Sequence, residues 1–284
     1  MYQSVLVTGA SSGIGEATAI HLAHKGFRVY AAARSTSKLN TLSGLGGGAI
    51  HPLTMDVTDE GSIAKALGEI KAKGETLYGL VNNAGISVMG PLEQVSVDDW
   101  RRQYETNVFG LVKVCAGVLP QMREAGRGRI VNIGSLAGRI AAPFQGAYAS
   151  SKHAVEGLSD SLRREVEPRG IKVSVVRPGF INTPFGHQEQ AVLDKFIGDG
   201  QPYSDQVQIF KSWHAKGHPT APPPIVVAEA VHKALTAERP QARYTAPTQA
   251  IGLLMLRNFL PAAIVDRIFE RVNGLDAYRK RNNS

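Results

Sequence analysis

The sequence has little of what secreted, zinc-binding or membrane-spanning proteins need. Its 284 residues include a single cysteine, Cys115, which excludes an intramolecular disulfide and a cysteine-based zinc site. We interpret Cys115 as a small core residue and expect no metal site. No run of about 18 uncharged apolar residues occurs, because Arg257 and Asp266 interrupt the nearest candidate at 246–269. We therefore expect no transmembrane segment.

Signals for export and for nucleic-acid binding are also scarce. A strand-like run at 5–7 begins almost at once, without a basic segment or cleavage site before it, so we expect a cytoplasmic protein. The excess of 32 lysines and arginines over 24 acidic residues gives a net charge of +8. This charge permits a phosphorylated cofactor, nucleic acid or acidic lipid as a partner. The densest basic cluster, at 279–281, is too short to indicate a nucleic-acid groove, so we expect no nucleic-acid partner.

The sequence does contain an alternation of short apolar runs with longer amphipathic ones. The short runs are rich in Val and Ile, as strands buried on both faces are. We expect strands at 4–8, 28–32, 49–54, 77–81, 129–133, 172–176 and 242–245. We expect helices at 13–25, 59–73, 97–123, 145–167 and 227–236. This order predicts an α/β fold, a doubly wound and mostly parallel seven-stranded sheet with helices on both faces.

Two segments depart from this alternation. Residues 1–245 are expected to form one dinucleotide-binding and catalytic domain, and residues 182–225 are an insertion in it, rich in Gly, Pro, Phe and Gln. An insertion of this length is typical of a lid or binding loop. Residues 246–284 are expected to be a helical, amphipathic and basic extension of the same domain. In order of preference, this tail caps the substrate cleft, packs in an oligomer or makes peripheral membrane contact.

A glycine-rich turn follows the first expected strand and precedes a helix. Gly9, Gly13 and Gly15 allow a sharp turn and a close approach of the backbone to a pyrophosphate. Their spacing is G-x-x-x-G-x-G, which differs from the common dinucleotide fingerprint. The strand–turn–helix context nevertheless predicts a Rossmann-type dinucleotide site at the carboxyl ends of the strands.

The residue after the second strand indicates which dinucleotide binds. Arg34 lies nineteen positions past Gly15, where an acidic residue would bind the ribose diol of NAD and an arginine suits the 2′-phosphate of NADP. Ala33 offers no carboxylate that would repel this phosphate, and Ser11 and Ser12 can add hydrogen bonds. We therefore expect NADP(H) as the cofactor in preference to NAD(H).

A series of motifs runs along the chain in one order: the turn at 8–15, Asp56-Val57, Asn82-Asn83-Ala84-Gly85, Asn107, Ser135, Tyr148-Ala149-Ser150-Ser151-Lys152 and Pro178-Gly179. Together they resemble the short-chain dehydrogenase/reductase family over residues 4–183, and most closely its steroid and retinol dehydrogenase branch. The resemblance implies an alcohol dehydrogenase or carbonyl reductase. It also implies a homodimer or homotetramer that pairs through the helices carrying Asn107 and Tyr148.

The expected catalytic chemistry also follows from residue types. Tyr148 and Lys152 are four residues apart on one helix and share a face. A nearby ammonium would lower the tyrosine pKa from about 10, which suits a general acid and base. Ser135 lies just past the fifth strand, where its hydroxyl can donate to the substrate oxygen. By resemblance, Lys152 also holds the nicotinamide ribose, and Asn107 anchors a water chain that relays protons to Lys152.

The same motif match assigns the rest of the cofactor site. Asp56 and Val57 are implied to contact adenine, Asn83 and Gly85 to line the cofactor with backbone, and Thr183 to reach the nicotinamide carboxamide. The full expected cofactor set is Gly9, Ser11, Ser12, Gly13, Ile14, Gly15, Arg34, Asp56, Val57, Asn83, Ala84, Gly85, Tyr148, Lys152, Pro178, Gly179, Ile181 and Thr183.

Aromatic residues are the candidates for the substrate pocket. Phe144, Phe180, Phe185, Phe196, Phe210 and Trp213 provide an apolar wall suited to a bulky lipophilic carbonyl or alcohol, although each of them also suits core packing. We therefore expect an NADP(H)-dependent oxidoreductase acting on a small molecule. The alternative is a catalytically idle dinucleotide sensor or scaffold on the same fold, which would not need the set Asn107, Ser135, Tyr148 and Lys152.

Overall fold

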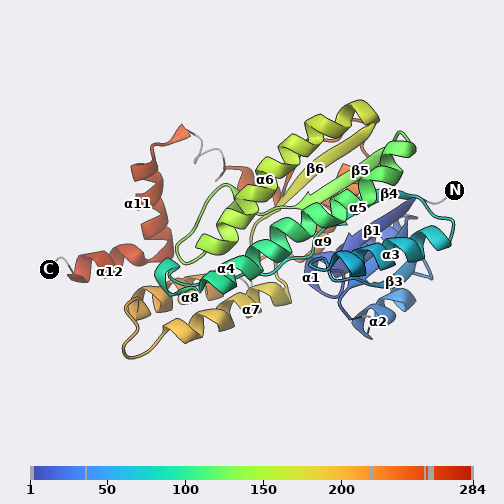
Figure 1. The fold of residues 1–284 in the computed structure, drawn as a ribbon. Coiled ribbons are helices and arrows are strands. Elements are labelled where there is room, and N and C mark those ends of the chain that lie inside the picture. The colour runs from blue at the N-terminus through green and yellow to red at the C-terminus, as the bar shows by residue number, and fades with distance from the viewer. Residues whose placement is uncertain (1–2, 36, 218–219, 253, 255–258, 283–284) are drawn as a thin grey trace.

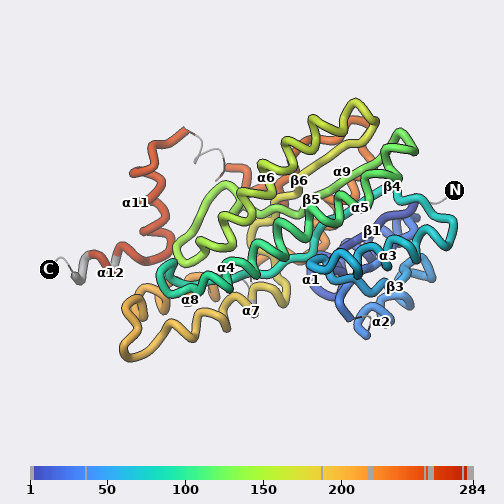
Figure 2. The backbone as a smooth tube through the Cα atoms, viewed as in Figure 1, coloured from blue at the N-terminus to red at the C-terminus, as the bar shows by residue number. Residues whose placement is uncertain are grey.

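The computed structural model describes residues 3–35, 37–217, 220–252, 254 and 259–282 (Figures 1 and 2). Seven parallel strands form one sheet in the order β3-β2-β1-β4-β5-β6-β7. The strands are β1 (Ser4–Thr8), β2 (Arg28–Ala33), β3 (Ile50–Thr54), β4 (Leu77–Asn82), β5 (Gly128–Ile133), β6 (Ile171–Pro178) and β7 (Arg243–Ala246). The strand order reverses between β1 and β4, which opens a binding crevice at the carboxyl edge. The expected doubly wound α/β fold is confirmed.

Helices cover both faces of this sheet. Their bounds are α1 (Gly13–His24), α2 (Ser37–Leu45), α3 (Glu60–Ala72), α4 (Val97–Tyr104), α5 (Gly110–Glu124), α6 (Gly146–Val166), α7 (Pro184–Leu193), α8 (Ser204–Gly217), α9 (Ile225–Thr236), α11 (Ala262–Asn273) and α12 (Leu275–Asn282). Core side chains of α1, α2 and α9 pack on one face, and those of α3 and α5 pack on the other. Figure 1 shows α7, α8, α11 and α12 together at the end of the molecule away from the N-terminus.

The strands are apolar on both faces because each face packs against helices. Successive side chains of a strand point to opposite faces. In β1, Val5 and Val7 therefore join the α1–α9 core cluster, whereas Leu6 between them joins the α3–α5 cluster. This double burial explains the near-continuous Val and Ile runs.

The structure shows how the helices begin and where they are interrupted. The Oγ of Ser96 accepts a hydrogen bond from the backbone N–H of Asp99 and so caps α4. The long helix expected at 97–123 is interrupted by a π-helical turn at Glu105–Phe109. Helix α2 was not predicted from the sequence, since its nine residues are rich in Ser, Gly and Asn and bury only Leu39 and Leu42.

The insertion is not a loop. Most of it forms α7 and α8, which build a third apolar cluster at the carboxyl edge of the sheet with residues from the segment after β4. In the described part of the tail, residues 262–273 and 275–282 form the helices α11 and α12, as expected. Within the described ranges, no helix combines the length and apolar character needed to cross a membrane. The same ranges bring no three His, Cys, Asp or Glu side chains together as metal ligands.

Candidate active site

The glycine turn between β1 and α1 is shaped by close backbone packing. Gly9 has a φ of +64°, and a Cβ placed on it would lie 2.8 Å from the Cα of Ala84. A Cβ on Gly15 would lie 2.3 Å from the carbonyl oxygen of Gly9. A side chain at either position would therefore displace backbone. The turn leads into the N-terminus of the twelve-residue helix α1, where free N–H groups favour an anion.

Asn83 fixes this turn to the end of β4. Its side-chain amide donates to the carbonyl oxygens of Thr8, at 3.0 Å, and of Gly9, at 3.1 Å. The backbone N–H groups of Asn83 and Ala84 both donate to the Thr8 hydroxyl, at 3.0 Å. We expected Asn83 to act through its backbone, so this side-chain role was missed. An amide residue directly after a buried strand is the signal that could have indicated it.

The structure places Arg34 at the exposed end of β2, close enough to Asp56 to influence its titration. The Asp56 carboxylate accepts hydrogen bonds from the N–H and the hydroxyl of Thr58, at 2.9 and 2.8 Å. Burial raises the pKa of Asp56, but the Thr58 hydrogen bonds and the positive charge of Arg34 bring it below its ordinary value. Asp56 therefore remains an anion, and Arg34 lies beside it at the edge of the sheet.

Thr183, which follows β6, packs against the same turn. It lies at the start of α7 and is buried, and its Cβ is 3.3 Å from where a Cβ on Gly13 would be. Ile181 is also buried, with its side chain in the core beneath the turn. The expected cofactor residues thus follow the carboxyl ends of β1, β2, β3, β4 and β6.

Helix α6 carries Tyr148 and Lys152 on one face at the end of β5. Tyr148 is half-buried, and Lys152 is only 6% exposed. The Nζ of Lys152 lies 5.8 Å from the centre of the Tyr148 ring and donates to the carbonyl oxygen of Ile133 at 2.8 Å. Ser135 follows β5, where its hydroxyl accepts from the N–H of Ala137 at 3.1 Å and lies near enough to Tyr148 to act on the pKa of the phenol. Ser135, Tyr148 and Lys152 are therefore brought together as expected.

The electrostatics of this group differ from the expectation. Burial raises the pKa of Tyr148 well above its ordinary value, the charge of Glu189 raises it further, and the hydrogen bond with Ser135 acts in the opposite direction. Burial also lowers the pKa of Lys152 to about 8. The expected lowering of the tyrosine pKa by Lys152 is wrong for this structure, because desolvation of the phenol dominates.

Asn107 lies in the π-helical turn, in the interior of the protein. Its side-chain oxygen accepts from the N–H of Ile86 at 2.9 Å, and its amide donates to the Ile86 carbonyl at 3.0 Å. The amide is also 3.3 Å from the hydroxyl of Ser151, which donates to the Tyr148 carbonyl at 2.7 Å. Asn107 therefore links the segment after β4 to the catalytic helix. Single π-helical turns of this kind are common at functional sites.

Gln103 acts beside Asn107 and was not predicted from the sequence. It is fully buried one turn earlier, where its amide donates to the Ile86 carbonyl at 2.9 Å and its oxygen accepts from the Val88 N–H at 2.7 Å. Together the two amides satisfy the irregular backbone that follows β4. A glutamine four residues before an asparagine is too ordinary a pattern to have indicated this pairing.

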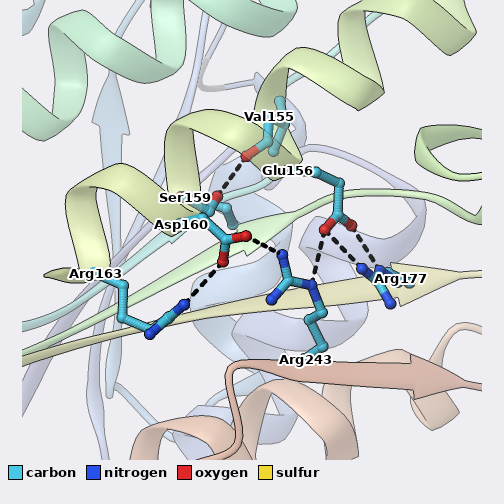
Figure 3. A network of polar contacts seen from close by, with 8 residues as sticks. Val155, Glu156, Ser159, Asp160, Arg163, Arg177 and Arg243 are labelled. Atoms are coloured by element: carbon cyan, nitrogen blue, oxygen red, sulfur yellow. Dashed lines mark hydrogen bonds and ion pairs between the residues drawn. The ribbon is translucent and has the colours of Figure 1, made fainter.

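A network of charges holds α6 on the sheet (Figure 3). Arg177 of β6 donates to both carboxylate oxygens of Glu156, at 2.6 and 2.7 Å, and Arg243 of β7 donates to Glu156 at 3.1 Å. Asp160 accepts from Arg243 at 2.6 Å and from Arg163 at 3.0 Å. These hydrogen bonds lower the pKa of Asp160 to about 2. Glu156 follows Lys152 by one helical turn, so the network fixes the part of α6 that carries the catalytic residues.

The aromatic candidates divide into two groups. Phe196 and Phe210 are fully packed in the third apolar cluster, at 4% and 0% exposure, so the structure gives them a core role. The ring of Phe185 lies 6.1 Å from that of Tyr148, and Phe180, 38% exposed, lies 5.4 Å from Trp213. Phe180 and Phe185 are therefore placed to meet a substrate.

The tail lies beside the loop between Ser135 and Tyr148. Helices α11 and α12 and residues 140–143 line a cavity of about 710 Å³. This position favours the first interpretation of the tail, as a cap beside the substrate cleft. That the tail contacts a bound substrate stays a prediction.

A glycine-rich turn on a parallel sheet, joined to a Ser–Tyr–Lys group at the same edge, defines a dinucleotide-dependent oxidoreductase site. The family of the chain follows from comparison with known proteins. The model of the short chain dehydrogenase family matches residues 3–193. The chain belongs to the short-chain dehydrogenase/reductase family, and is an oxidoreductase.

Its relatives support the steroid and retinol branch of that family. The chain is 34% identical over 277 residues to human retinol dehydrogenase 5, covering 93% of this chain and 86% of that protein. It is 39% identical over 203 residues to the 3-ketodihydrosphingosine reductase of Bacteroides thetaiotaomicron, covering 72% of each chain. The solved structure of ElxO with NADP bound has a TM-score of 0.71 and 27% identity, covering 86% of this chain and 97% of that one.

Proposed function

We propose that this protein is an NADP(H)-dependent oxidoreductase that interconverts a bulky, lipophilic alcohol and its ketone or aldehyde. The observation that carries the proposal is the grouping of Ser135, Tyr148 and the buried Lys152 at the carboxyl edge of the sheet, with the Lys152 Nζ 5.8 Å from the centre of the Tyr148 ring. The idle sensor would need no such group. The cofactor, when bound, supplies or accepts a hydride at this edge.

The residues present suit a dinucleotide. The cradle between Gly9 and Gly15 leaves no room for a side chain, and α1 presents its N-terminus there. Arg34, exposed at the end of β2, provides a positive charge where the 2′-phosphate of NADP would lie. The NADP bound to ElxO, a relative in structure, supports the same choice.

Ser135, Tyr148 and Lys152 have separate roles toward the substrate. Ser135 orients the substrate oxygen and donates to it as negative charge develops there. Tyr148 gives its phenolic proton to that oxygen in reduction and removes it in oxidation. Lys152 places a positive charge beside the phenol, which offsets part of the desolvation of the tyrosinate that remains after the proton leaves. Because burial holds the Tyr148 pKa high in the structure, the phenol is ready as the acid of the reductive direction.

The substrate class is inferred from the walls of the pocket. Phe180 and Phe185 present apolar rings beside Tyr148 and the adjoining apolar cluster. Two relatives are named after large lipophilic substrates, a retinol and a sphingoid ketone.

We also propose a cytoplasmic homodimer or homotetramer, since α5 and α6 expose Val112 and Leu158.

The test is NADPH oxidation by the purified protein against steroid, retinoid, aromatic and short aliphatic carbonyls. NADH and a Tyr148→Phe variant would be measured in parallel. We expect turnover that prefers NADPH and large substrates and falls at least about a hundred-fold in Tyr148→Phe. Tight NADPH binding with no turnover of any carbonyl would overturn the enzyme proposal in favour of the sensor. An equal rate with NADH would overturn the role of Arg34.

A further inference from the structure

A buried pair of ionisable side chains lies in the insertion, outside the catalytic group. The Oε2 of Glu189, on α7, is 3.3 Å from the Nε2 of His214, on α8. Glu189 is 7% exposed and His214 is 1% exposed. The surroundings are aromatic, since the rings of Phe180 and Phe210 lie 5.3 and 6.0 Å from the imidazole. A carboxylate in such a place requires a physical reason.

Glu189 lies close to the reacting phenol. Phe185 and Glu189 are four residues apart on α7 and therefore share one face of the helix. The Phe185 ring lies 6.1 Å from the Tyr148 ring. Glu189 is thus one helical turn, about 5.4 Å, further along the face that meets the catalytic tyrosine. The effect of its charge on the Tyr148 pKa supports this proximity.

The pair is not needed to join the two helices. Leu193 and Phe196, at the end of α7 and just after it, already pack with Val207 and Phe210 of α8 in one buried apolar cluster. Apolar side chains at 189 and 214 would extend that cluster without the cost of removing charges from water. A buried polar pair adds little to stability that well-packed apolar residues cannot. The position of Glu189, one helical turn from the Phe185 ring that meets Tyr148, therefore calls for a role in recognition.

We propose that Glu189, held by His214, is a polar subsite of the substrate pocket that accepts a hydrogen bond from an amino or hydroxyl group a few bonds from the reacting carbon. This inference rests on the proposed function. A carboxylate has about four lone-pair positions, so the contact with His214 leaves capacity for a donor from the substrate. The rings beside Tyr148 and His214 are those of Phe185, Phe180 and Phe210, so this subsite selects lipophilic carbonyls that carry one additional donor.

The physical basis for selection is the free-energy cost of leaving a buried polar group without a hydrogen-bond partner. A site built to hydrogen-bond a substrate group rejects the analogue that lacks it, because the buried partner is then left unsatisfied. A protonated amine adds charge attraction to the hydrogen bond, whereas a hydroxyl forms the hydrogen bond alone. The amine is therefore expected to be selected more strongly than the hydroxyl.

The experiment uses three straight-chain ketones of equal length: a plain ketone, its neighbouring-carbon hydroxyl derivative and the matching primary amine. The full-length protein would be assayed with NADPH as wild type, Glu189→Gln and His214→Gln. Glu124→Gln, which removes an exposed carboxylate of α5, is the matched control. We expect the wild type to favour a donor-bearing ketone by about ten-fold or more in kcat/KM. This ratio should collapse in Glu189→Gln and remain in Glu124→Gln.

Calorimetric binding of the same ketones to the protein with NADP⁺ gives the ratio without turnover. Equal affinity and equal kcat/KM for all three ketones in the wild type would overturn the subsite. A uniform loss for all ketones in Glu189→Gln and His214→Gln, with a lower Tm, would also overturn it and identify a tie between α7 and α8. Failure of the proposed function would differ, since donor-bearing ketones would bind selectively but none would be reduced.

Discussion

The cofactor side and the substrate side of this molecule are built by different means. On the cofactor side, backbone geometry defines the site, through the packing of Gly15 against Gly9 and the hydrogen bonds that join Thr8 to Asn83. On the substrate side, side chains of α7 and α8 define it, through aromatic contacts and the pair Glu189–His214. Backbone geometry tolerates few substitutions, whereas side-chain walls can change one residue at a time.

This difference separates recognition of a constant ligand from recognition of a variable one. A dinucleotide presents the same phosphates to any protein that binds it, so a fixed turn at a helix N-terminus suffices. In the proposed function, the substrate contacts a surface whose shape depends on the packing of a third apolar cluster, separate from the two that cover the sheet. Its specificity therefore resides in the part of the chain with the least regular sequence pattern.

The largest expected effect sharpens the comparison within the substrate side. Phe196→Ala removes a ring that is 4% exposed and packs against Gly90, so we expect a loss of about 3–5 kcal/mol in unfolding free energy. Phe180→Ala removes a partly exposed ring and should cost only about 1 kcal/mol, while raising KM for large substrates. Urea unfolding and steady-state kinetics would measure both. Equal destabilisation by the two variants would contradict the division between core and wall.

The next effect tests the cofactor side. In Gly15→Ala the added methyl group meets the Gly9 carbonyl, so the turn must move, and we expect NADPH affinity to fall about a hundred-fold. Gly68→Ala is the matched control, because Gly68 lies on the exposed face of α3 with open space around it. That variant should gain about 0.5–1 kcal/mol in stability and bind NADPH normally. Calorimetry with NADPH would show this, and unchanged affinity in Gly15→Ala would refute the cradle.

The smallest expected effect on stability concerns the ionic network of Glu156 and Asp160, which holds α6 on the sheet. The pKa of Asp160 falls from 3.8 to about 2 on folding, so its contribution is present above about pH 4 and is lost as pH falls toward 2. We expect Asp160→Asn to cost about 1–2 kcal/mol at pH 7, with the difference from wild type shrinking below pH 4. The exposed Asp98→Asn should change stability by less than about 0.5 kcal/mol. A difference that persists at pH 2 would show that Asp160 acts through packing.

Much of the cofactor side could be predicted from the sequence because its constraints are local. Short apolar runs, most of them rich in Val and Ile, indicated the seven strands within about two residues, and the glycine spacing indicated the turn. The side-chain bonds of Asn83 and Gln103 join residues separated by up to 75 positions, which no local pattern contains. The raised pKa of Tyr148 was missed because burial, set by the whole fold, outweighs the neighbouring lysine.

The substrate side was less predictable for a different reason. The amphipathic pattern of α7 and α8 is weak, and glycines and prolines before and between them suggested a loop. Helices α7 and α8 are stabilised by tertiary packing against residues 88–95. Their helical structure therefore cannot be predicted without knowing that these segments pack together. The contact between Glu189 and His214 could not be predicted, because nothing in their spacing places them on facing helices.

The network around Glu156 also bears on how the protein is made. Arg243, the first residue of β7, is 87 positions later in the chain than its partner Glu156. During synthesis on a ribosome, the glycine turn and its β4 clamp are complete once about a third of the chain has emerged. The catalytic helix gains its last ionic contacts only when β7 has been added at the edge of the sheet. All residues of the phosphate cradle have therefore emerged well before the residues that anchor α6 to the edge of the sheet.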